Sequence, residues 1–82
     1  MNKALPLARR LIAAGTLPMH DKVKTFGGCS TGSRCRLCGE PIRAGQAEIE
    51  LEDSATRTAT ILHPDCHAAW LAASQGREVR QA

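Results

Sequence analysis

The chain has 82 residues, a formal net charge of +3, one Phe, one Trp and no Tyr. This length allows one small domain with a thin core, which usually needs a metal ion or disulfides to be stable. The apolar runs are too short to cross a bilayer, and Arg9 and Arg10 interrupt the first of them, so neither a membrane span nor a secretory signal is expected. We therefore expect a cytoplasmic protein with no membrane contact.

An amphipathic helix is expected over residues 5–14. Pro6 suits an early helical position, and Gly15 suits the position just after a helix end. Leu7 and Leu11 lie about one turn apart and share an apolar face. A helix this short is marginal alone, so we expect it to dock on the rest of the domain.

The segment after this helix, residues 16–34, is expected to be irregular. It contains Pro18 and a cluster of Gly and Ser residues at 27–33, a composition typical of loops. We therefore expect three parts in the chain: a helix with its linker, a zinc-binding domain, and a flexible polar tail. Their ranges are residues 1–24, 25–76 and 77–82.

Two strands joined by a short loop are expected next. Residues 47–52 alternate strictly between apolar and acidic side chains, and residues 56–62 are rich in Thr and β-branched residues. Residues 53–55 then form the hairpin loop. Both strands present an apolar face on the same side in a register that pairs Glu52 with Thr56, Ile49 with Ala59 and Ala47 with Ile61.

A second helix is expected to begin at His63-Pro64-Asp65. Pro64 fits the first helical position, and the carboxylate of Asp65 favours the positive N-terminal end of a helix. Gly76 is expected to end this helix. Its expected buried face carries Cys66, Ala69, Trp70 and Ala73.

The most informative motif is a pair of half-sites, one a Cys-x₂-Cys and the other a His-x₂-Cys. Three thiolates and one imidazole complete the tetrahedral shell of a structural zinc site. Two disulfides are the chemical alternative, but a reducing cytoplasm favours a metal at this spacing. We therefore predict one structural Zn²⁺ held by Cys35, Cys38, His63 and Cys66.

Two further residues leave alternatives open. His67 adjoins Cys66, but neighbouring helical positions diverge by about 100°. We favour His63 as the ligand because its spacing from Cys66 is typical of such sites, and we expect His67 to be a solvated helix residue. Cys29 is an alternative ligand or a redox thiol. We favour an ordinary thiol there, because the sequence places no general base beside it.

The order of a zinc knuckle at Cys38-Gly39, a hairpin and a helix with two ligands at its first turn is that of a treble-clef zinc finger. The motifs Cys-x₂-Cys-x₂-Pro-Ile-x₂-Gly and His-x₂-Cys-x₃-Trp resemble the zinc finger of poly(ADP-ribose) polymerases and the first half of a LIM domain. Residues 28–70 are also similar to small uncharacterised bacterial proteins with a CxxC and a downstream HxxC. The polymerase resemblance implies DNA-end binding, the LIM resemblance implies protein binding, and the bacterial resemblance implies a fold without an activity.

Charge and composition favour a protein partner over a nucleic acid. A centre of three thiolates and one Zn²⁺ carries a net charge of about −1, which brings the metallated chain to about +2. Nucleic-acid binders usually show a clear basic stripe and aromatic platforms for bases. Basic residues do surround the knuckle, so nucleic-acid binding is the alternative function; they are Lys22, Lys24, Arg34, Arg36 and Arg43. An acidic row on the outward strand face opposes it, formed by Glu48, Glu50 and Glu52.

Catalysis is the least supported function. A catalytic zinc keeps one coordination position open, whereas here four ligands are already in place. The glycines at 27, 28 and 32 match no phosphate-binding motif. We therefore expect an interaction module that is not an enzyme, with an oligomeric state that the sequence leaves open.

Overall fold

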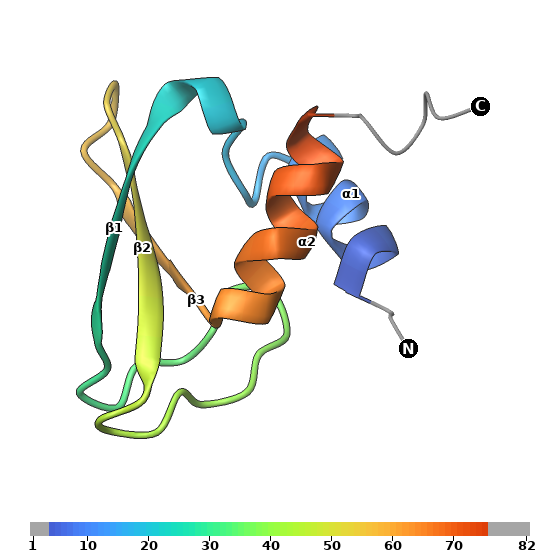
Figure 1. Cartoon of the computed structure of the whole chain (residues 1–82). Coiled ribbons are helices and arrows are strands. Elements are labelled where there is room, and N and C mark those ends of the chain that lie inside the picture. The colour runs from blue at the N-terminus through green and yellow to red at the C-terminus, as the bar shows by residue number, and fades with distance from the viewer. Residues whose placement is uncertain (1–3, 76–82) are drawn as a thin grey trace.

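The computed structural model describes residues 4–75 and is a small α+β fold, as the sequence predicts. In chain order its elements are α1 (Ala4–Ala13), the 3₁₀ helix η1 (His20–Lys22), β1 (Val23–Cys29), β2 (Ala47–Asp53), β3 (Ala59–Leu62) and α2 (Pro64–Gln75). The strands form one antiparallel sheet in the order β1-β2-β3. Helix α2 lies beside this sheet, and α1 packs against α2 (Figure 1).

Helix α1 forms close to where the sequence predicts it. It ends where Gly15 adopts a φ of +81°, a left-handed conformation that glycine takes without steric cost. The N–H of Thr16 then donates to the carbonyl of Leu11 at 2.8 Å and closes the last turn. Ala8 is fully buried, so the helix docks on the domain as expected.

Helix α2 begins at Pro64, as predicted, because a missing N–H costs nothing at the first helical position. The N–H of His67 donates to the carbonyl of His63 at 2.8 Å and completes the first turn. The expected helix end at Gly76 and the expected tail at 77–82 lie outside the described residues. The buried residues of α2 are Cys66, Trp70 and Ser74.

The prediction that residues 16–34 are irregular is wrong for residues 20–29, which form η1 and β1. Strand β1 pairs with β2 along its whole length. It contains Gly27 and Gly28, and its only half-buried residue is Val23. Gly27 and Gly28 weaken the strand propensity of the preceding Val, Thr and Phe residues, and no buried face marks the segment, so pairing with β2 supplies its order.

The hairpin is present, but its loop is longer than predicted and its register differs by three residues. The carboxylate of Asp53 accepts the N–H groups of Ala55 at 2.8 Å and Thr56 at 3.3 Å. Arg57 adopts a φ of +62°, and β3 begins only at Ala59. This side-chain-stabilised turn replaces the predicted three-residue loop. In place of the predicted pairs, Glu52 lies opposite Ala59, Glu50 opposite Ile61 and Ile49 opposite Leu62.

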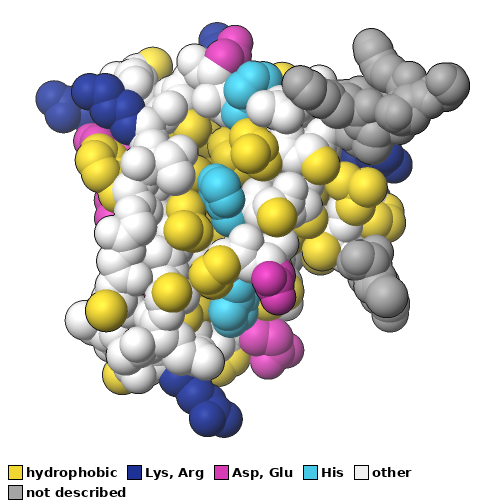
Figure 2. All heavy atoms as spheres, viewed as in Figure 1, with side chains coloured by type: hydrophobic (Ala, Val, Ile, Leu, Met, Phe, Trp, Pro, Cys, Tyr) yellow, Lys and Arg dark blue, Asp and Glu magenta, His cyan; other side chains and the backbone are white. Residues whose placement is uncertain are grey.

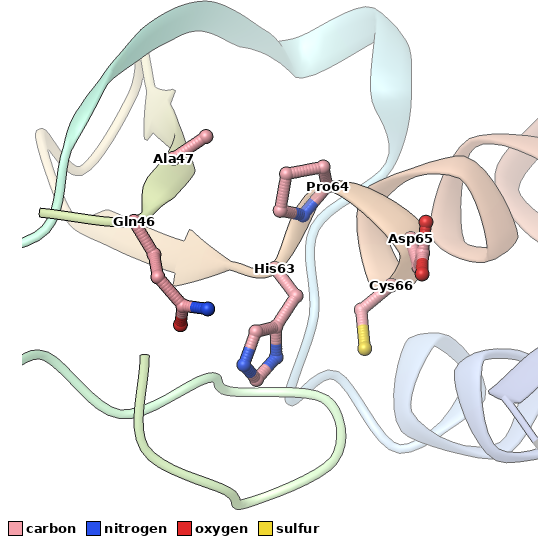
Figure 3. Close-up of a pocket in the computed structure, with 6 residues that line it drawn as sticks. All are labelled: Gln46, Ala47, His63, Pro64, Asp65 and Cys66. Atoms are coloured by element: carbon pink, nitrogen blue, oxygen red, sulfur yellow. The ribbon is translucent and has the colours of Figure 1, made fainter. Parts of the chain in front are cut away.

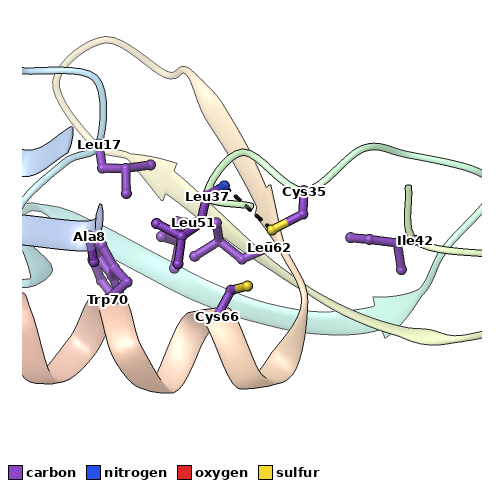
Figure 4. Packing of buried hydrophobic residues seen from close by; sticks show 9 residues of the cluster. All are labelled: Ala8, Leu17, Cys35, Leu37, Ile42, Leu51, Leu62, Cys66 and Trp70. Atoms are coloured by element: carbon purple, nitrogen blue, oxygen red, sulfur yellow. Dashed lines mark hydrogen bonds between the residues drawn. The ribbon is translucent and has the colours of Figure 1, made fainter. Parts of the chain in front are cut away.

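The buried core lies between the sheet, α2 and the knuckle loop, which contains the turn over residues 35–39 (Figure 4). Trp70 lies at the centre of this core and is only 1% exposed. Its indole N–H donates to the carbonyl of Pro18 at 2.8 Å. The Oγ of Ser74 lies 2.9 Å from Nδ1 of His20 and fixes the end of α2 to η1. Within residues 4–75, no helix combines the length and hydrophobicity that a bilayer crossing requires. The core residues are Ala8, Leu17, Cys35, Leu37, Ile42, Leu51, Leu62, Cys66 and Trp70.

Candidate metal centre

Cys35, Cys38, His63 and Cys66 come together where the knuckle loop meets the start of α2. Each offers one ligand atom, and these atoms all lie within 4.8 Å of one another. In a Zn²⁺ tetrahedron with Zn–S bonds of about 2.3 Å, sulfur atoms are about 3.8 Å apart. Shifts of about 1 Å therefore close the four side chains around one ion. Cys35 and Cys66 are buried, His63 is half-buried and Cys38 is exposed. The cluster therefore extends from the core to the protein surface.

A tight turn over residues 35–39 presents the first two sulfur atoms. The Sγ of Cys35 accepts the N–H of Leu37 at 3.4 Å and the N–H of His63 at 3.5 Å. The N–H of Gly39 donates to the carbonyl of Cys35 at 3.0 Å, and Gly39 adopts a φ of +80°. Only glycine takes this backbone conformation readily, which explains its place after Cys38.

Ser30 holds the loop that leads into this turn, a role that the sequence analysis missed. Its buried hydroxyl donates to the carbonyl of Ile42 at 2.8 Å. The same oxygen accepts the N–H groups of Gly32 at 3.0 Å and Ser33 at 3.2 Å. A serine followed two residues later by glycine is a known local turn signal, but its distant partner Ile42 is not readable from the sequence.

His63 and Cys66 reach the cluster from the start of α2. In Figure 3 the imidazole of His63 and the thiol of Cys66 point to the same side, toward the knuckle loop. Nδ1 of His63 lies 3.4 Å from Sγ of Cys38, and Nε2 lies 3.3 Å from the carbonyl of Pro41. A hydrogen bond from Nε2–H to this carbonyl leaves the Nδ1 lone pair for a metal, the arrangement that outer contacts impose on ligating histidines.

The two buried thiols have opposed acidities. Burial alone would raise the pKa of Cys35, but N–H groups of Cys38, His63 and Leu37 outweigh it and lower that pKa to about 7. Burial, together with the nearby Cys35 and Cys38 sulfur atoms, raises the pKa of Cys66 to about 12. The thiolate form of Cys35 is therefore stabilised, whereas burial and the neighbouring sulfur atoms disfavour the thiolate form of Cys66. A divalent cation would remove this opposition, because it compensates the charge that the thiolates share.

Cys29 and His67 both lie outside this group of four. Cys29 is exposed at the end of β1, opposite Ala47 of β2. The ring of His67 lies 5.5 Å from that of Trp70, and burial lowers the pKa of His67. His67 is therefore half-buried against the core, not solvated as the sequence suggests.

An open hollow of about 490 Å³ adjoins the cluster. Two of its lining residues, His63 and Cys66, belong to the cluster, and Asp65 supplies the only other ionisable side chain there within residues 4–75. In Figure 3 the carboxylate of Asp65 points away from the imidazole. The hollow therefore contains no pair of acid–base groups beyond the candidate ligands.

Comparison of the chain with family models, curated proteins and solved structures gives no match.

Proposed function

We propose that this protein is a small zinc-binding module whose single Zn²⁺ is structural, and that it acts by binding another protein. The observation that carries the proposal is the convergence of three thiols and one imidazole within 4.8 Å. Four protein ligands complete a zinc tetrahedron, and closed sets of this kind hold structure together. The ion would tie the knuckle loop to the start of α2.

Zinc is the metal that this donor set favours. Thiolates together with imidazole suit Zn²⁺, whereas Mg²⁺ and Ca²⁺ prefer oxygen ligands. The N–H groups directed at Cys35 and the carbonyl next to His63 are the orienting contacts that such sites use. We also propose a cytoplasmic location, because a reducing compartment keeps these thiols free to bind metal.

We further propose that the knuckle, the β2–β3 hairpin and α2 form a treble-clef finger, to which α1 and β1 are added. Two observations support this assignment. Ligands sit in the knuckle and at the first turn of α2, and an antiparallel hairpin lies between them in sequence. The sulfur of Cys66 at a helix N-terminus also benefits from the helix dipole as a thiolate.

A role without catalysis is part of the proposal. Catalytic zinc needs a coordination position for water or substrate, and four protein ligands occupy the tetrahedron. The hollow beside the cluster offers Asp65 alone as a further ionisable group among the described residues.

A protein partner is favoured over a nucleic acid by the surface charge. Figure 2 shows Lys and Arg side chains at separate margins of the face it presents, without one continuous basic patch. Phe26 is the one aromatic side chain that is strongly exposed within residues 4–75. Stacking platforms for bases are therefore scarce.

The metal is tested first. Protein purified under reducing conditions should contain one Zn²⁺ per chain by elemental analysis, and Cys35→Ser should lose it. Cys29→Ser is the matched control and should keep full zinc content, because Cys29 lies outside the cluster. Metal-free wild-type protein, or equal loss in both variants, would refute the structural zinc.

The partner class is tested by titration with single- and double-stranded DNA and RNA. We expect binding weaker than about 1 μM at physiological salt, the range of non-specific association. Tighter binding that weakens steeply with salt, and is lost when Arg34, Arg36 and Arg43 are replaced, would select nucleic-acid binding instead.

A further inference from the structure

Strand β1 leaves one edge of the sheet open, and we propose that this edge pairs with β1 of a second copy of the chain. The product is a symmetric dimer with a continuous antiparallel sheet. The dimer goes beyond the function proposed above and does not depend on it, because the edge carries none of the four candidate ligands. Figure 1 shows β1 at the margin of the sheet, next to β2.

The backbone of β1 is ready for a second strand. The N–H of Ser30 donates to Gln46 at 2.8 Å, and the carbonyl of Lys22 accepts the N–H of Ser54 at 3.1 Å, both on the β2 side. Bonding residues alternate in an antiparallel pair, so the even-numbered residues of β1 face β2. The odd-numbered residues direct their N–H and C=O groups to the open edge, without partners within residues 4–75; they are Val23, Thr25, Gly27 and Cys29.

Apart from Lys24, this edge lacks the features that usually protect a sheet edge against pairing. Sheet edges in natural proteins are blunted by Pro, by bulges, by charged side chains or by very short strands. Strand β1 is seven residues long, has no Pro and carries Lys24 as its only charge. Phe26 lies in its middle and is 48% exposed. A second strand would cover both the free backbone groups and this ring.

One antiparallel register pairs all four edge residues of each copy. It places Thr25 opposite Gly27 of the second copy, and Val23 opposite Cys29. Two hydrogen bonds for each such pair give about eight across the dimer. Sliding the second strand by two residues leaves either Val23 or Cys29 without a partner, so this register is the most favourable.

The same register brings the two Phe26 side chains face to face across the two-fold axis. They occupy a non-hydrogen-bonded pair, in which Cα atoms are about 4.5 Å apart. Aromatic cross-strand pairs are among those that stabilise sheets. The exposed ring of the single chain thus becomes the centre of the interface.

Charge complementarity fixes the second contact. In this register Lys24 faces Gly28 of the second copy, and Gly28 is paired with Glu48 in its own sheet. Because Gly28 has no side chain, the Lys24 side chain can extend over it to the Glu48 carboxylate. The Oε1 atom of Glu48 is enclosed within its own chain and has no hydrogen-bond partner among the described residues, so the contact with Lys24 would be made through the second carboxylate oxygen.

Lys24 is available for this contact. The nearest carboxylate in its own sheet belongs to Glu52, which lies opposite it on β2. That carboxylate is 4.0 Å from the guanidinium of Arg57, and Lys24 forms no ion pair within residues 4–75. Symmetry makes the Lys24–Glu48 contact twice in each dimer.

The test is sedimentation equilibrium of the zinc-loaded protein. An edge pair of this length is small against the standard interface of about 1,600 Å², so we expect reversible dimerisation with a Kd of roughly 1–100 μM. Lys24→Glu and Glu48→Lys should each raise this Kd by about tenfold, because each places like charges together twice. The double variant should restore it. Arg10→Glu, an exposed charge change on α1, is the control and should leave the Kd unchanged.

A disulfide trap tests the register independently of the charges. In a Cys29→Ser background, Phe26→Cys should form an intermolecular disulfide under mild oxidation, because about 4.5 Å between Cα atoms lies within the range for such bonds. Lys24→Cys should not, since position 24 faces Gly28 of the second copy and not position 24 of that copy.

Zinc content is measured on every variant. A zinc-loaded monomer at about 500 μM overturns the dimer and leaves the zinc proposal intact. A double charge variant no tighter than the single ones, or equal trapping at both positions, overturns this register.

Discussion

His63 shows how neighbours assign one side chain its role at the candidate metal centre. Its Nδ1 faces Sγ of Cys38 at 3.4 Å, while its Nε2 faces the carbonyl of Pro41 at 3.3 Å. His67 follows one turn along the chain, and its ring packs against Trp70 instead. Two histidines four residues apart therefore have different surroundings: His63 belongs to the candidate metal cluster, and His67 packs on the core.

His63→Ala should weaken zinc binding by more than about a hundredfold, since even outer contacts of metal ligands are worth roughly 10–100-fold. His67→Ala removes a ring that packs on Trp70 and should leave zinc affinity unchanged. Competition with a chromophoric chelator measures both affinities. A larger loss at His67 would mean that the imidazole of His67 is the ligand.

The four candidate ligands could be predicted from the sequence because their identity depends on side-chain chemistry and spacing. The role of His67 could not, because its environment depends on how α2 packs on the core. Ser30 was missed for a related reason, since its hydroxyl bonds to the carbonyl of Ile42, 12 residues away. Side-chain types and their spacing can be read from the sequence, whereas contacts between residues far apart in the chain cannot.

Among the elements, the pair α1–α2 depends on small residues. Ala8 is fully buried on α1, whereas Ala13 at the end of the same helix is exposed. Close packing leaves little room for added atoms at Ala8. The helix pair therefore tolerates a large side chain at one of these alanines and not at the other.

Ala8→Leu should lower the free energy of unfolding by about 1–3 kcal/mol, because overpacking forces neighbouring side chains and backbone to shift. Ala13→Leu is the matched control, with the same substitution in the same helix, and should change stability by less than about 0.5 kcal/mol. Urea titration of the zinc-loaded variants gives both values. Equal effects would mean that α1 is not held against α2 in solution.

The elements differ in how far the sequence predicts them. Helix α1 and strand β2 carry periodic patterns and lie close to their predicted ranges, and α2 begins at Pro64 as predicted. Strand β1 has no buried face, and its order comes from pairing with β2. The hairpin register depends on the turn that Asp53 stabilises, which alternation alone does not reveal.

For the whole molecule, the candidate ligands and the core are continuous. Cys35 and Cys66 are counted among the buried core residues, together with Trp70 (Figure 4). In small zinc domains the free energy of metal binding is also free energy of folding. Loss of the ion should therefore disturb packing around Trp70 as well as the knuckle.

Chelation should shift the fluorescence emission of Trp70 to longer wavelength, because its ring is 1% exposed in the folded chain and would meet water. Added Zn²⁺ should reverse the shift. Cys35→Ser protein is the control and should resemble the chelated state with or without added metal. Unchanged emission and a cooperative unfolding transition after complete zinc removal would show that the core is stable without the ion.

The contacts that join the ends of the chain also have a consequence for its synthesis. Hydrogen bonds join Pro18 to Trp70 and His20 to Ser74. The N-terminal segment therefore cannot reach its folded position until α2 has been synthesised. The ribosome adds about 5–20 residues per second, and Cys66 follows Cys38 by 28 positions. For roughly one to six seconds, each nascent chain therefore carries the first two candidate ligands without the complete second pair. During that interval both thiols are open to oxidation and to metal ions other than zinc, and the reducing compartment proposed above would protect them before the chain has folded.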